Sequence, residues 1–487
     1  MRLCFNGIEM GTARTIAKNT IFIAAAEIVT KILFFVLSIL LARYLGDIGF
    51  GKFSLALAFP YLFIAFADFG LGILTIREVS RDRTLASKYL GNLTLAKLVL
   101  SIATFLFIVI VINAMNYPSD TVAAVYILGG YLIVDSFNAF LRSIFRAFEK
   151  MLYEAVVRIL ERALTFGLVV WFIHLQYGLL PISLSFVISV CIGFILTAAL
   201  VMKKFARPRF EIDKAFLKKA LSEAWPFAIT GLLTMLYFRV DTVMLSAMKG
   251  DAEVGWYNAA YNIIFGLTFI PWSYIGAVFP VMSRYFNSSK DSLFKLGVKS
   301  FKYLTIVGFP ISIGVTLLAS RIMSLLYGEE YANGVLALQI LIWSFFAMCL
   351  CGTLTATLNS MNKQRIVAIG MSITVVLNII LNFILIPKYS LMGAAVATLV
   401  VCVFEFFFEL YYTRKYAFKL MLKGQDIIKI IAINLLLGLF IFYVDTRLSI
   451  TITLSIVIYT ALILLAKVIS KEDIKIIKDI ISTKQRM

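Results

Sequence analysis

The chain has 487 residues, of which 61% are hydrophobic, and it carries a formal net charge of +19. Soluble globular domains are about 45–50% apolar, so this composition excludes an ordinary water-soluble fold. The positive charge does not require a nucleic acid partner, because basic connections of a membrane protein face anionic lipid.

Fourteen apolar runs follow one another along the chain. Leu, Ile, Val and Phe dominate them, and each is about twenty residues long, enough to cross a hydrocarbon core as a helix. Since a helix satisfies its own backbone hydrogen bonds, the pattern predicts an all-α polytopic membrane protein with about 14 transmembrane helices. The runs are residues 20–42, 53–75, 90–113, 121–142, 152–173, 179–202, 225–248, 255–279, 301–320, 334–356, 366–386, 393–412, 427–444 and 448–468.

The basic residues fall mostly between alternate pairs of runs. Of 46 Lys and Arg, 31 lie at the termini or in the even-numbered connections, and only six lie in the odd-numbered ones. Positively charged connections stay in the cytoplasm. We therefore expect a multi-pass protein of the plasma (cytoplasmic) membrane with both termini cytoplasmic.

The connections on the outer side are too short for a catalytic domain. Links 114–120, 174–178, 249–254 and 445–447 hold only a few residues each. We find no Gly-rich phosphate loop with its lysine, no HExxH and no GxSxG. The five cysteines lie in the N-terminal tail or in apolar runs, which indicates no disulfide framework. The sequence thus favours transport over catalysis, with no catalytic residue, no metal ligand and no cofactor expected.

Two segments indicate an internal repeat. Residues 41–56 and 245–260 each contain a Gly-Asp turn followed by a glycine and an aromatic residue, so that Gly51 aligns with Gly255. Parallel repeats that rock against each other are a common route to alternating access. We expect two six-helix lobes plus two C-terminal helices. The predicted domains are an N-terminal lobe (1–202, helices 1–6), a cytoplasmic linker (203–224), a C-terminal lobe (225–423, helices 7–12), and helices 13–14 with a cytoplasmic tail (424–487).

Ionisable side chains lie inside several runs, mainly in the first lobe. Each costs at least about 2.5 kcal/mol at the bilayer centre, so each is expected to face a partner or a wet cavity. Glu27, Asp68, Lys97, Asp135 and Glu161 each fall about seven to nine residues from the cytoplasmic end of their run, a depth of about 10–14 Å. These positions predict a shared polar layer.

Four cations at similar or greater depth favour an anion-binding cavity. Arginine forks pair bidentately with phosphate oxygens, so an anionic head group such as a pyrophosphate is the expected ligand. The candidate substrate-binding residues are Arg162, Lys31, Arg158 and Arg239. The candidates for balancing charge, or for coupling to Na⁺ or H⁺, are Asp68, Asp135, Glu161, Asp241 and Glu27. Buried ion pairs that hold the lobe together are the alternative for any one of them.

A set of short motifs carries a family resemblance: residues 67–72 with 76–80, 239–244, 254–261, 355–365, 381–389 and 393–398. These segments resemble polysaccharide flippases of the Wzx type, which belong to the superfamily of MATE drug exporters and MurJ lipid II flippases. The resemblance implies two six-helix lobes around a central cavity, two further helices, and transport of a polyprenyl-linked saccharide to the outer leaflet. It also implies ion coupling in some members.

We therefore interpret the chain as a flippase that moves a polyprenyl-(pyro)phosphate-linked oligosaccharide between leaflets by alternating access. The expected partners are that lipid-linked glycan, membrane lipids, and glycosyltransferases or other glycan-assembly proteins, with no nucleic acid. One alternative is a MATE-type cation-coupled multidrug exporter, which fourteen runs and several intramembrane Arg and Lys disfavour. Another is a membrane-embedded glycan-assembly enzyme, which the short outer connections disfavour.

Overall fold

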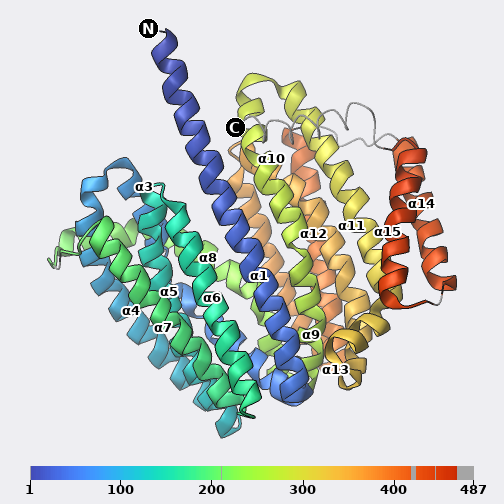
Figure 1. The fold of residues 1–487 in the computed structure, drawn as a ribbon, viewed down its shortest axis with the longest axis horizontal. Helices are drawn as coiled ribbons and strands as arrows, with labels where there is room; N and C mark the ends of the chain where they lie inside the picture. Colours follow the sequence, from blue (N-terminus) through green and yellow to red (C-terminus); the bar gives the residue numbers. More distant parts are fainter. Residues whose placement is uncertain (1, 210, 418–423, 445, 469–487) are drawn as a thin grey trace. The chain divides into compact units, whose positions relative to one another are not determined.

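The computed structural model describes residues 2–209, 211–417, 424–444 and 446–468, and in the first helix it describes the side chains of residue 19 and of residues from 22 onward. These residues are almost entirely helical, and no strand occurs among them, which confirms the predicted all-α fold (Figure 1). The helices are α1 (Arg2–Tyr61), α2 (Ile64–Asp68), α3 (Leu71–Arg81), η1 (Arg83–Leu85), α4 (Ala86–Ala114), α5 (Ser119–Ala147), α6 (Met151–His174), α7 (Leu179–Lys204), α8 (Lys214–Met248), α9 (Asp251–Leu267), α10 (Phe269–Ser288), α11 (Lys290–Tyr327), η2 (Glu329–Gly334), α12 (Val335–Ser360), α13 (Gln364–Tyr416), α14 (Gly424–Tyr443) and α15 (Leu448–Leu465).

Eleven helical stretches of the described chain are long and apolar enough to cross a membrane. Some of these helical stretches contain two of the apolar runs that the sequence predicted. The backbone of α1 leaves the helical region at Gly46 (φ 70°, ψ 179°), and that of α13 does so at Ser390 (φ 51°, ψ −133°). The charged helix α6 falls outside the eleven because Arg158, Glu161 and Arg162 lie within its apolar part. The chain is therefore a multi-pass membrane protein, and the number of fourteen crossings stays a prediction.

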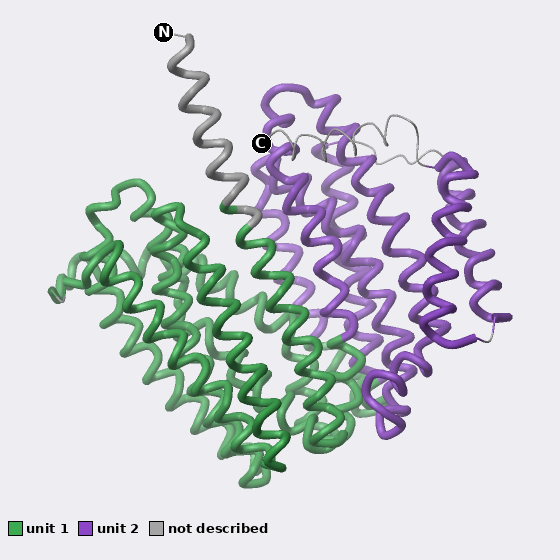
Figure 2. The backbone as a smooth tube through the Cα atoms, in the orientation of Figure 1, with its two compact units in different colours: residues 1–262, 379–391 green, residues 263–378, 392–487 purple. Residues whose placement is uncertain are grey.

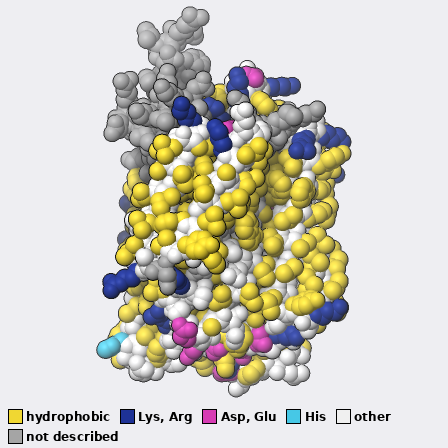
Figure 3. Space-filling view, turned by 90° about the vertical axis from the view of Figure 1, so that its right-hand side faces the viewer, with side chains coloured by type: hydrophobic (Ala, Val, Ile, Leu, Met, Phe, Trp, Pro, Cys, Tyr) yellow, Lys and Arg dark blue, Asp and Glu magenta, His cyan; other side chains and the backbone are white. Residues whose placement is uncertain are grey.

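Large hydrophobic side chains are exposed on the helix faces. On α14 and α15 they include Leu435, Phe442 and Leu465. On the face that Figure 3 shows, hydrophobic side chains cover most of the middle, and charged side chains gather mainly toward the two ends. An exposed apolar surface of this kind suits contact with lipid.

The chain divides into two compact units (Figure 2). Unit 1 comprises Met1–Asn262 and Ile379–Leu391, and unit 2 comprises Ile263–Asn378 and Met392–Met487. Unit 1 thus contains α1 to α8, most of α9 and a short part of α13. The lobe and linker boundaries predicted from the sequence concern the repeat, and they stay a prediction.

In unit 1, the packing of α1, α5 and α6 determines which of their polar faces meet. α1 packs against α6 and α5, and α5 packs against α7. A core of buried apolar side chains, with Phe140 and Phe145 among its largest members, joins α5 to α3, α4 and α8. Because α5 is held on several sides, the side chains on its remaining face are directed toward α1 and α6.

The two segments that the sequence aligns as a repeat lie against each other inside unit 1. A Cβ atom added to Gly51 would lie 1.8 Å from the carbonyl oxygen of Asp251, and one added to Gly255 would lie 2.1 Å from that of Asp47. Only glycine allows two backbones to approach so closely. The alignment of Gly51 with Gly255 therefore corresponds to a reciprocal backbone contact.

In unit 2, α11 packs against α10 and α12, and α14 and α15 pack against α11. The ammonium of Lys302 on α11 lies 2.7 Å from Asp426 on α14, and the Tyr459 hydroxyl on α15 donates to the carbonyl of Ile306 at 2.7 Å. These polar contacts hold the two last helices beside an apolar groove of about 480 Å³ that α11, α14 and α15 line.

Candidate functional site

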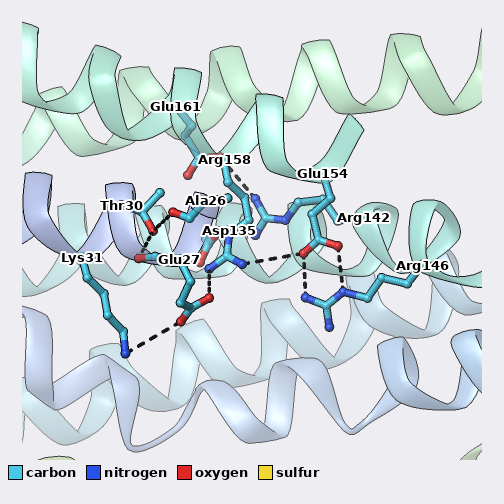
Figure 4. A network of polar contacts seen from close by, with 10 residues as sticks. All are labelled: Ala26, Glu27, Thr30, Lys31, Asp135, Arg142, Arg146, Glu154, Arg158 and Glu161. Atoms are coloured by element: carbon cyan, nitrogen blue, oxygen red, sulfur yellow. Dashed lines mark hydrogen bonds and ion pairs between the residues drawn. The ribbon is translucent and has the colours of Figure 1, made fainter. Parts of the chain in front are cut away.

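A network of charged side chains joins α1, α5 and α6 in unit 1 (Figure 4). Helical spacing brings these side chains together. On α6, Glu154, Arg158 and Glu161 lie at positions i, i+4 and i+7, which form one face of the helix. On α5, Asp135 and Arg142 are two turns apart on one face. Since α1 packs against both helices, these faces meet.

Glu27, Arg158 and Glu154 form a chain of ion pairs between α1 and α6. The Arg158 guanidinium lies 3.2 Å from Glu27 and 3.8 Å from Glu154. The Lys31 ammonium lies 4.0 Å from the other oxygen of Glu27, and Arg146 donates two hydrogen bonds to Glu154, at 2.8 and 2.6 Å. Glu154 is buried, and two arginines compensate its charge. Two of the predicted phosphate ligands, Lys31 and Arg158, are thus paired with carboxylates.

Arg142 lies between two of the predicted acidic residues. Its guanidinium donates to Asp135 at 3.0 Å and to Glu161 at 3.3 Å. The Asn138 amide donates to the same Glu161 oxygen at 2.8 Å. Two carboxylates therefore share one guanidinium, which leaves this part of the network with one negative charge in excess if both are ionised.

Lys97 of α4 is fully buried and neutralised by Asp68. Its ammonium donates to the Asp68 carboxylate at 3.0 Å, to the Ser136 hydroxyl at 2.6 Å and to the Ala67 carbonyl at 3.3 Å. These three acceptors use all three N–H groups of the ammonium. The Asp68 side chain is 38% exposed, so it connects this buried cation to the surface of unit 1.

Arg162 and Arg239, the other two predicted phosphate ligands, stack on aromatic rings. The Arg162 guanidinium lies 5.2 Å from the centre of the Phe34 ring, and the Arg239 guanidinium lies 5.3 Å from that of Tyr61. Neither arginine forms an ion pair with a residue that the structure describes. Stacking leaves the N–H donors at the edge of a guanidinium available. Of the four predicted phosphate ligands, these two retain donor capacity.

Asp241 of α8 belongs to a different group from the other candidates. The Tyr257 hydroxyl of α9 donates to its carboxylate at 3.0 Å, and the Asn382 amide of α13 donates to the other oxygen. All three residues are in unit 1. The nine predicted residues therefore comprise six ion-paired side chains, two stacked arginines and the hydrogen-bonded carboxylate of Asp241, and their roles stay predictions.

A cavity of about 230 Å³ opens beside the network, with all its walls in unit 1. Its charged lining residues are Asp68, Arg142, Arg146, Glu154 and Arg158. Three guanidinium groups and two carboxylates give it a net positive lining. In the part of the chain that the structure describes, no three His, Cys, Asp or Glu side chains group as metal ligands.

The sequence reasoning did not identify Arg142 and Arg146 as members of the site. Both lie at the predicted cytoplasmic end of their run, where basic residues are expected for topology alone. A signal was present, because Asp135, Arg142 and Arg146 are spaced by seven and four residues. Glu154 follows on the next helix after a short turn, which places it opposite the end of α5.

The sequence model of a family described as polysaccharide biosynthesis protein matches residues 16–286, more than half of the chain. The chain belongs to this family. A second family model, MatE, matches residues 226–384. Both matches confirm the resemblance found in the sequence. Together they make this family member a membrane transporter and not an enzyme.

Relatives and solved structures agree with the family. A putative O-antigen transporter of Shigella flexneri is 24% identical over 372 residues, covering 73% of this chain and 88% of that protein. A lipid II flippase MurJ in an inward closed conformation matches with a TM-score of 0.76 and 16% identity, over 91% of this chain and 97% of that one. An inward-facing multidrug resistance MATE transporter matches with a TM-score of 0.66 and 16% identity, over 79% and 95%. The fold is that of these transporters.

Proposed function

We propose that this protein flips a polyprenyl-(pyro)phosphate-linked oligosaccharide from the cytoplasmic to the outer leaflet of the plasma membrane by alternating access. The observation that carries the proposal is the pair of stacked arginines, Arg162 and Arg239, in a member of the polysaccharide biosynthesis family. The O-antigen transporter and lipid II flippase among the similar proteins support the same class of substrate.

The phosphate or pyrophosphate head would be held by Arg162 and Arg239 through their free N–H donors. Lys31 and Arg158 would join them by exchanging Glu27 for a phosphate oxygen, since Glu27 lies 4.0 and 3.2 Å from them. An incoming anion can replace a carboxylate in such pairs without leaving a cation unpaired. Sugars would occupy a wet interior while the lipid tail stays in the bilayer.

The distribution of basic residues supports the direction of transport. With cytoplasmic termini and a cytoplasmic 203–224 connection, as the positive charges predict, the basic side would face the leaflet from which the lipid-linked glycan is taken up. Glycosyltransferases or other glycan-assembly proteins would then deliver the substrate from the cytoplasm.

Transport would be coupled to Na⁺ or H⁺. The candidates for this role are Asp68, Asp135, Glu161 and Asp241, each of which would bind the ion or balance the charge of a neighbouring base. The Tyr257 hydroxyl and the Asn382 amide donate hydrogen bonds to the carboxylate of Asp241.

A MATE-type exporter of cationic drugs is the second candidate, and the MatE match over residues 226–384 supports it. A cationic drug needs a carboxylate without a base. Around the proposed glycan site, Glu27, Glu154, Asp68 and Asp135 each pair with a cation, whereas Arg162 and Arg239 form no ion pair with a described residue. This balance of charges favours an anionic substrate.

The proposal is tested with Arg162 variants in cells that lack the chromosomal copy of this gene. Arg162→Ala is expected to abolish export of the lipid-linked glycan while protein levels in the membrane stay normal. Arg162→Lys should retain partial export, since the charge remains and the planar fork is lost. Arg414→Ala, at an exposed arginine of α13, is the matched control. Normal export by both Arg162 variants at wild-type protein levels would show that this residue does not bind the substrate.

A further inference from the structure

The cavity of about 230 Å³ in unit 1 has an apolar part and a polar part. Gly72, Ile73 and Ile76 of α3 form the apolar part, where Ile73 is 51% exposed and a Cβ atom added to Gly72 would meet no atom within 4 Å. The polar part comes from α2, α5 and α6, and four of its charged side chains are drawn in Figure 4. The polar lining residues are Asp68, Arg142, Ser143, Arg146, Glu154 and Arg158. A ligand that fills the cavity therefore has to offer apolar as well as polar surface.

Ion pairs balance the charges around the cavity. The lining alone has three guanidinium groups and two carboxylates, which leaves one positive charge in excess. Three acids and two bases outside the lining are joined to it by ion pairs and remove this excess when all groups are ionised: Glu27, Asp135, Glu161, Lys31 and Lys97. An anion in the cavity would leave the network with an uncompensated negative charge, which is unfavourable inside a membrane protein. The balance therefore favours a ligand without net charge.

The paired side chains still have hydrogen-bonding capacity. Arg142 and Arg146 each donate two hydrogen bonds, and a guanidinium has more N–H groups than these bonds use. Glu154 accepts two of these bonds, and a carboxylate has room for more. Donors and acceptors thus occur together in the lining. Because a hydroxyl group both donates and accepts, the hydroxyls of a sugar ring match the polar part, and the C–H faces of the ring match the apolar part.

The volume limits the ligand to one ring. The cavity of about 230 Å³ has the room of about eight water molecules. Pockets for whole drug-sized ligands are larger, at about 300–1,000 Å³. A single monosaccharide ring suits the smaller volume, whereas an oligosaccharide has to extend beyond it.

The position of the cavity identifies the ring. Arg158 lines the cavity, and it is also a proposed phosphate ligand, because a phosphate oxygen would replace its partner Glu27. A ring beside Arg158 is then the sugar that carries the phosphate. We propose that this cavity binds the first sugar of the lipid-linked glycan, the one joined directly to the phosphate, as a neutral ring. This inference rests on the proposed function and adds to it the part of the glycan that the protein recognises.

The test measures equilibrium binding of radiolabelled polyprenyl pyrophosphate to the purified full-length protein in detergent. The bare lipid is compared with derivatives that carry one glucose, one galactose or one N-acetylglucosamine. At least one of the three sugars is expected to raise the affinity about tenfold, since a few hydrogen bonds to charged groups add this much. If no derivative binds more tightly than the bare lipid, the cavity holds water only and the inference is wrong.

Two variants fill the cavity without changing a charge. Gly72→Leu places its side chain in the open space, and Ala139→Leu does so from an exposed lining residue of α5. Either variant should lose the affinity gained from the sugar and bind the bare lipid like the wild type, so one suffices if the other does not fold. Gly167→Leu is the matched control, because its added Cβ also meets no atom within 4 Å and Gly167 does not line the cavity. A gain from the sugar that both filled variants keep would contradict the site.

The bare lipid separates this inference from the proposed function. Bare polyprenyl pyrophosphate that binds the wild type tightly and Arg162→Ala weakly supports the phosphate site, whatever the sugars add. If the bare lipid does not bind, or if Arg162→Ala binds it equally well, the phosphate site itself is wrong, and the sugar site that rests on it is wrong too.

Discussion

Asp68→Asn is expected to lower the free energy of unfolding by about 2 kcal/mol. Lys97 is fully buried, and Asp68, at 3.0 Å, is its one carboxylate partner among the described side chains. Removing one member of a buried ion pair costs about 3–5 kcal/mol, because the other charge stays buried and unpaired. The hydroxyl of Ser136 and the carbonyl of Ala67 would still bind the ammonium. Since Asp68 is 38% exposed, solvent screening reduces the loss further, to about 2 kcal/mol.

Thermal and denaturant unfolding of the purified protein in detergent measure this change. Asp120→Asn is the matched control, because Asp120 pairs with Lys52 but is 48% exposed, and such surface pairs contribute about 0–1 kcal/mol. Lys97→Met added to Asp68→Asn should recover part of the lost stability, since it removes the unpaired charge. If Asp68→Asn is as stable as the wild type, the ammonium of Lys97 does not depend on Asp68.

The same variant separates a structural role of Asp68 from ion coupling. A coupling carboxylate would give an Asn variant that remains stable, binds substrate, and no longer responds to an ion gradient across vesicles. We expect the opposite for Asp68: lower stability, and a gradient response retained by the folded fraction. Flipping assays in vesicles with and without an imposed gradient distinguish the two roles.

Three further changes test other parts of the structure. Gly51→Ala should destabilise the protein by about 1–3 kcal/mol in the same unfolding assay, because the added Cβ would overlap a backbone carbonyl. Gly72→Ala should leave the stability unchanged, because no atom lies within 4 Å of the Cβ added there. A single cysteine at Lys218 should escape an impermeant reagent in intact cells and react after lysis; labelling in intact cells would contradict a cytoplasmic connection. A hydrogen bond from Lys88, together with a backbone amide, holds the pKa of Asp213 below its usual range. The contribution of Asp213 to stability is therefore present at neutral pH and is lost as the pH falls through the folded-state pKa. The Asp213→Asn variant should accordingly lose less stability than the wild type between about pH 6 and about pH 3. An equal loss of stability in both proteins would refute this role.

The sequence predicted the helices well because length and apolar composition determine them locally. It also predicted the contact between Glu27 and Lys31, since residues four apart on a helix are neighbours. It did not show that Arg142 would bind both Asp135 and Glu161, because that depends on how α5 and α6 pack. Side chains on separate helices meet only when the register between the helices is known.

The same limit applies to two buried carboxylates, Asp241 and Glu409. Asp241 meets Asn382, more than a hundred residues later in the chain, and Thr355 meets Glu409 on another helix. The break at Ser390, which ends the first part of α13, carries no glycine or proline at its own position. A non-glycine residue with positive φ is held there by its surroundings and not by local preference.

The contact between the repeated turns has a consequence for the origin of the chain. Gly51 meets Asp251 and Gly255 meets Asp47, so each turn uses the same two positions against the other. This is the rule of an isologous interface, in which residue i contacts j and residue j contacts i across a two-fold axis. A half-length ancestor with one copy of the turn could form this contact between two identical subunits. The fused gene would then preserve, within one polypeptide, the interface of a former homodimer.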